Sequence, residues 1–114
     1  MNFKLCAAAC AIAATLVSHA QAQSQQPAIS SAWDSMQVSQ NECFSRARNA
    51  FERMNFTRIE AIGNSVFADR GDFQFAFRCV SEKQMFYIYG GGPGDKDKQL
   101  DDYINDLKAE FGRR

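Results

Sequence analysis

The sequence predicts an α+β domain in which two amphipathic helices pack on one face of a three- or four-stranded antiparallel sheet. Two segments carry apolar residues at helical spacing, and a row of phenylalanines between them alternates at period two. Short connections join the strand-like segments, which favours an antiparallel meander. With 114 residues and a formal net charge of +0, the chain has room for one domain and gives no electrostatic sign of a nucleic-acid partner.

The first 22 residues have the features of a bacterial signal peptide. Lys4 precedes an apolar run from about Leu5 to Val17, which is too short to span a bilayer as a helix. Ala20-Gln21-Ala22 has the small-x-small spacing of a cleavage site. We therefore expect cleavage after Ala22 and a periplasmic or secreted protein with no membrane anchor. A retained anchor is the alternative.

The expected mature chain begins at Gln23 and holds about 92 residues. Residues 23–35 are polar at their start and lack a clear period, so we expect a flexible arm followed by a single small domain over residues 36–114. Only two cysteines remain, Cys43 and Cys79. In an oxidising compartment they predict one intramolecular disulfide. A reduced pair and a thiol linked to a partner are the alternatives.

The first helix begins after Ser39, which forms a capping box with Glu42. Asn55 suits the left-handed position that ends a helix. The apolar stripe of this first helix follows a spacing of i, i+4, i+7 and i+11 and consists of Cys43, Ala47, Ala50 and Met54.

Four strand-like segments follow, at residues 56–62, 65–70, 73–80 and 85–89. Gly63-Asn64 predicts a tight turn between the first two, and Gly71 supplies the positive φ angle that the next turn needs. The last two segments are the clearest strands.

The strand at residues 73–80 explains why a cysteine ends the phenylalanine row. Phe73, Phe75, Phe77 and Cys79 share one face because side chains alternate along a strand. Cys43 lies on the buried stripe of the first helix. Two independent periodicities therefore place both sulfurs in the same layer and predict a helix-to-strand bridge.

The second helix is expected over residues 98–111, after a glycine-rich loop. Asp95 or Asp97 can cap its start, where the helix dipole favours acidic side chains. Its buried stripe consists of Leu100, Tyr103, Ile104, Leu107 and Phe111.

With both helices on one side, the opposite face of the sheet is left open. The side chains expected there combine aromatic rings, a thioether, an amide and a guanidinium; they are Gln74, Arg78, Met85, Tyr87 and Tyr89. Tyrosine and arginine are enriched where proteins bind partners, so this face is the candidate partner-binding surface. The simpler interpretation is that tyrosine tolerates exposure and suits strands.

Two acidic groups are weaker candidates. The loop and helix start with Gly92, Gly94, Asp95 and Asp97 has free backbone N–H groups and carboxylates that suit an anion or a cation, but a solvated helix start is the simpler interpretation. Asp69 and Asp72 bracket a turn and are turn formers rather than an acid/base pair.

No motif names a reaction. The expected mature chain has no histidine and no free thiol, which argues against Ser-His or Cys-His catalysis and against a zinc site. No cofactor is expected. The leading expectation is a non-enzymatic module that binds a protein partner in the cell envelope, as an inhibitor or immunity protein does. Binding of a small apolar or anionic ligand is the alternative, and a carboxylate-dependent hydrolase is a distant third.

Overall fold

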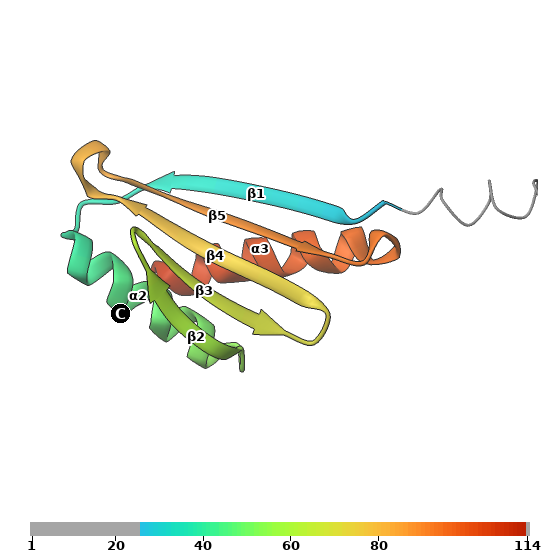
Figure 1. Ribbon diagram of the computed structural model, residues 1–114. Helices are drawn as coiled ribbons and strands as arrows, with labels where there is room; N and C mark the ends of the chain where they lie inside the picture. The colour runs from blue at the N-terminus through green and yellow to red at the C-terminus, as the bar shows by residue number, and fades with distance from the viewer. Residues whose placement is uncertain (1–25, 114) are drawn as a thin grey trace, which may run out of the picture.

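The computed structural model describes residues 26–113, which form a single five-stranded sheet with two helices (Figure 1). The expected signal peptide therefore lies outside the described residues. The elements in chain order are β1 (Ala28–Ser35), α2 (Gln40–Arg53), β2 (Thr57–Ile62), β3 (Ser65–Arg70), β4 (Phe73–Val80), the short 3-10 turn η1 (Ser81–Lys83), β5 (Met85–Gly92), the 3-10 turn η2 (Gly94–Lys96) and α3 (Asp97–Phe111).

All neighbouring strands are antiparallel, and their order across the sheet is β1-β5-β4-β3-β2. Strands β2 to β5 form the predicted meander. The turn at Gly63 and the turn at Gly71 both use positive φ angles, of 60° and 56°. A side chain would be strained at these angles, which is why glycine occupies both turns.

Strand β1 corrects the predicted flexible arm and the predicted strand number. It pairs with β5 along all eight of its residues and forms the edge of the sheet on that side. Ser30 donates a 2.5 Å hydrogen bond to Asp101 of α3, and Asp34 lies 3.7 Å from the Lys108 ammonium. The strand was missed because only the small Ala28 and Ala32 face the core, and because its pairing partner lies far along the chain.

Helix α2 begins as predicted. Ser39 is the N-cap, and its Oγ accepts a hydrogen bond from the Glu42 backbone N–H at 3.1 Å. The Glu42 carboxylate does not complete the capping box, because it pairs with Arg46 at 3.2 Å. Asn55 has the expected left-handed conformation, with a φ of 60°.

Helix α3 begins one residue earlier than expected, at Asp97. Its N-cap position is Lys96, and no side chain there accepts a backbone hydrogen bond. Neither Asp95 nor Asp97 is therefore the N-cap residue. The Asp97 carboxylate accepts from the Lys98 N–H within the first turn instead.

Both helices cover the same face of the sheet and enclose one core with the inward-facing strand residues (Figure 1). Phe77 lies at its centre, with ring centroids 5.1 Å from Phe51 of α2 and 5.4 Å from Phe111 of α3. Cys43 and Cys79 are buried and lie at disulfide distance, with their Cα atoms 6.1 Å apart. The predicted helix-to-strand pair is thus in place.

Candidate functional site

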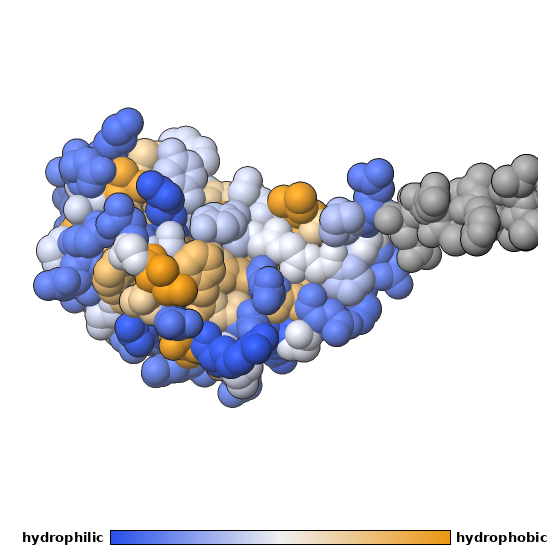
Figure 2. All heavy atoms as spheres, viewed as in Figure 1, coloured by the Kyte–Doolittle hydropathy of each residue, from blue (hydrophilic) through white to orange (hydrophobic). Residues whose placement is uncertain are grey.

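The face of the sheet opposite the helices carries the large exposed hydrophobic side chains of the described residues. Six large hydrophobic residues within residues 26–113 are exposed, and strand alternation places all of them on this face. They are Ile29, Trp33, Ile62, Phe67, Tyr87 and Tyr89. We call this surface the open face. Figure 2 shows it, with hydrophobic side chains over the strands bordered by hydrophilic ones.

The ladder registers align these side chains in rows across the strands. Trp33 of β1 is opposite Tyr87 of β5, which is opposite Arg78 of β4. In the next row, Tyr89 is opposite Ala76, and Ala76 is opposite Phe67 of β3. Directly opposed side chains lie about 5 Å apart at their Cβ atoms, so each row is a continuous surface.

The five predicted partner-binding residues all lie on the open face. They alternate with the buried residues of β4 and β5, as the period predicted. Met85 is half-buried at the end of β5, where its sulfur lies 3.6 Å from the Tyr87 hydroxyl. Gln74 lies at the other end of the face. Their role in binding stays a prediction.

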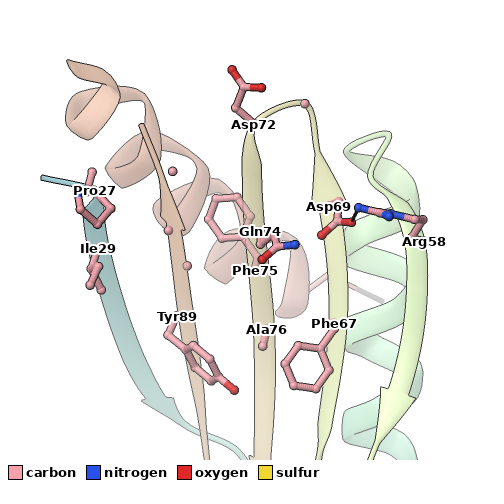
Figure 3. Close-up of a pocket in the computed structure, with 15 residues that line it drawn as sticks. Pro27, Ile29, Arg58, Phe67, Asp69, Asp72, Gln74, Phe75, Ala76 and Tyr89 are labelled. Atoms are coloured by element: carbon pink, nitrogen blue, oxygen red, sulfur yellow. Dashed lines mark ion pairs between the residues drawn. The ribbon is translucent and has the colours of Figure 1, made fainter. Parts of the chain in front are cut away.

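A groove of about 570 Å³ crosses the open face over the glycines of β5 (Figure 3). Gly91 is opposite both Ile29 and Gln74, and its missing side chain leaves the space between β1 and β4 unfilled. Pro27 and Ile29 form one side of the groove, and the Tyr89 ring bounds one end. The volume falls in the range of small-molecule sites, although the groove is open to solvent.

The neighbouring glycines of β5 have a different role, because they face the core. A Cβ atom at Gly90 would lie 2.4 Å from the Phe75 ring, and one at Gly92 would lie 2.5 Å from the Phe73 ring. The rings occupy the space that side chains would fill. Gly90 and Gly92 therefore make room for phenylalanine rings in the core, whereas Gly91 leaves a groove on the open face.

The polar end of the groove carries two carboxylates in separate ion pairs. Asp69 pairs with Arg58 of β2, as the dashed line in Figure 3 marks, and Asp72 lies 3.5 Å from the Lys96 ammonium. An acid/base pair needs two acids that converge on one reacting group. Each of these acids faces its own cation, so the geometry gives the hydrolase hypothesis no support.

The glycine loop predicted as a weak ion site is packed against the chain. A Cβ atom at Gly94 would overlap the Gln26 backbone, so the segment before β1 contacts this loop. Within residues 26–113, no group of three or more acidic, histidine or cysteine side chains is arranged to hold a metal ion. Asp95 and Asp97 therefore belong to no cluster that favours a cation.

Sequence reasoning missed four residues of the open face: Ile29, Trp33, Ile62 and Phe67. Ile29, Ser31 and Trp33 alternate with residues that face α3, so a period-two signal was present in the segment predicted to be flexible. Phe67 was predicted within a strand, but its face depended on a register that the sequence did not define.

No protein-family model matches the chain, and no curated protein matches it. Neither of the two helices in the described part of the chain is long and apolar enough to cross a bilayer.

Proposed function

We propose that the protein is a small exported, non-enzymatic module that binds a protein partner of the cell envelope through its open face, as inhibitor and immunity proteins do. The observation that carries the proposal is that, within residues 26–113, all six exposed large hydrophobic residues lie on one face. Scattered single residues of this kind are ordinary, but a continuous group on one surface is typical of an interaction site.

The composition of the open face supports binding of a protein. Trp33, Tyr87 and Arg78 form one row, and these residue types are enriched among the residues that dominate binding energies. The groove beside Tyr89, of about 570 Å³, has the volume to receive an apolar side chain of a partner.

A quantitative binding comparison tests this proposal. The wild type and the double variant Tyr87→Ala/Tyr89→Ala are used as baits in periplasmic extract, and the affinity of each captured protein is then measured with purified components. We expect the double variant to lose more than about tenfold in affinity, since central aromatic residues are frequent hot spots. The matched control is Arg48→Ala/Glu52→Ala on the exposed side of α2. Equal affinities for all three baits contradict the proposal.

Export is tested separately by the intact mass of the protein recovered from the periplasm or the medium. The proposal requires a chain that begins at Gln23. Alkylation with and without prior reduction shows whether Cys43 and Cys79 are bonded to each other. A protein that is retained in the cytoplasm with its leader contradicts export, whatever the open face binds.

A second candidate function is binding of a small ligand in the groove, because the hollow over Gly91 has the volume for one. Gly91→Val fills the hollow and removes such a ligand. Tyr87 does not line the groove, so Tyr87→Ala leaves the ligand bound but weakens a protein partner. Because a protein partner would also use the groove, Gly91→Val weakens both kinds of binding, and the response to Tyr87→Ala separates the two functions.

A further inference from the structure

The two edges of the sheet differ in how they are protected from pairing with another chain. At the β2 edge the register is interrupted between Thr57 and Glu60, and Arg58 adopts a φ of 53°. A bulge with charged residues is a common protection of an edge strand. Strand β1 has no such feature: its eight residues are in continuous register and include one charged residue, Asp34.

Strand β1 also presents the two most exposed large hydrophobic side chains of the described residues. Ile29 is 81% exposed and Trp33 is 60% exposed, although both belong to a regular strand. A long edge in continuous register, with a single charged residue and exposed apolar side chains, is a template for adding another strand. We infer that β1 pairs antiparallel with β1 of a second copy of this chain, so that the two sheets become one.

Strand geometry selects the register of this pairing. Opposed residues of an antiparallel pair point to the same side, so a residue of the open face must meet one of the open face. Full overlap of residues 28–35 violates this rule. With Ser31 on the two-fold axis, Trp33 of each copy meets Ile29 of the other, and seven residues of each strand pair. A shift that places Ala32 on the axis sets Trp33 against Ser31 and leaves Ile29 without an apolar neighbour.

The direction of α3 is compatible with the same arrangement. The contacts from Ser30 to Asp101 and from Asp34 to Lys108 show that α3 runs in the direction of β1. The two copies of α3 therefore run antiparallel across the axis. The dipoles of the two helices then oppose each other, which is a favourable arrangement for neighbouring helices.

Pairing would also complete the groove. Ile29 forms part of the groove wall, and Trp33 of the second copy would lie directly beside it. The second copy thus adds an aromatic side chain to the site. This consequence rests on the proposed function of the open face, whereas the self-association does not.

The first test measures association and uses the single tryptophan of the chain as a probe. Sedimentation velocity of the purified protein should shift from monomer to dimer as concentration rises, and Trp33 emission should shift to shorter wavelength in parallel, because Ile29 then covers the ring. Ser31→Lys places two ammonium groups opposite each other at the axis and should raise the dimer dissociation constant by about fivefold or more. The matched control Ser35→Lys, on the same strand and face but beyond the paired segment, should not.

The second test fixes the register. Ser31→Cys brings two thiols together at the axis, within the Cα separation that a disulfide requires, and mild oxidation should yield a covalent dimer. Ser35→Cys should stay monomeric under the same oxidation. Far-ultraviolet circular dichroism of each variant confirms that the monomer is folded.

A wild type that is monomeric at every concentration overturns the inference. This holds even if β1 is found to pair with a strand of a different protein. Equal crosslinking through positions 31 and 35 overturns the register. Neither outcome depends on the partner-binding experiment, so the failure of one proposal is distinguishable from the failure of the other.

Discussion

Aromatic side chains line both faces of the sheet, but their surroundings differ. On the inner face, Phe75 and Phe77 are at most 2% exposed and contact rings from the helices and the neighbouring strands. On the open face, Phe67 and Tyr89 are 36% and 40% exposed. The rings under the helices are shielded from water, whereas the rings of the open face keep part of their surface in contact with it. We therefore expect the first group to contribute more to stability and the second to be accessible to a partner.

The largest test of this comparison removes one ring from each face. Phe77→Ala leaves a cavity between α2, α3 and the sheet, and we expect the free energy of unfolding to fall by about 3–5 kcal/mol. Phe67→Ala, the matched change on the open face, should cost less, about 1–2 kcal/mol, because Phe67 is 36% exposed and its removal leaves no enclosed cavity. Urea unfolding of both variants measures the difference. Similar losses would show that the open face is covered in solution.

The bridge between Cys43 and Cys79 fastens α2 to the inner face only. Replacing both residues with alanine should lower the free energy of unfolding by about 2–4 kcal/mol, because the bridge restricts a loop of 36 residues in the unfolded chain. Denaturant unfolding with and without reductant measures the loss. Reductant should destabilise the wild type and leave the double variant unchanged. If reductant leaves the free energy of unfolding of the wild type unchanged, Cys43 and Cys79 are not bonded to each other in the folded protein.

Two adjacent glycines of β5 allow the two faces to be compared, because Gly90 faces the core and Gly91 faces the groove. Gly90→Ala places a methyl group against the Phe75 ring and should cost about 1–3 kcal/mol. Gly91→Ala points into the groove, where the nearest atom is the Ala28 oxygen at 3.4 Å, and should change stability by about 0.5 kcal/mol or less. Thermal unfolding of the two variants measures both effects. The reverse order would mean that the two glycines face the opposite sides from those described.

The smallest effect concerns the ion pair that joins the two helices over the inner face. The hydrogen bond from Arg53, and then the one from Arg113, lowers the pKa of Glu110 below its ordinary value of 4.5. A lowered pKa stabilises the fold above the unfolded value and loses this contribution as the pH falls through the folded value. Arg53→Gln should raise the pKa of Glu110 toward 4.5 and make acid unfolding less steep.

Carboxyl chemical shifts of Glu110, followed by NMR from pH 7 downward, measure this shift. Lys98→Gln is the control, because Lys98 pairs with Asp102 on the exposed side of α3. An unchanged Glu110 titration in Arg53→Gln would show that the helices are not joined through this pair in solution.

Most of the inner layer was predictable from the sequence because its signals are local and agree with one another. The Ser39 cap, the stripe of α2 and the phenylalanine row of β4 each follow a single period, and the two cysteines belong to two of these patterns. Strand β1 was not predictable in the same way. Its side chains on the helix side are two alanines, a serine and an aspartate, so its hydrophobic pattern is faint until β5 provides the ladder.

The sequence by itself determined the two helices, the phenylalanine strand, the turns at Gly63 and Gly71 and the pairing of the cysteines, because hydrophobic period and turn chemistry act over a few residues. Only the tertiary structure decided that residues 28–35 complete the sheet, that Trp33 and Phe67 share a surface with Tyr87 and Tyr89, and that the glycines of β5 divide between packing and a groove. These features depend on strand order and register, which are set by contacts between segments far apart in the chain.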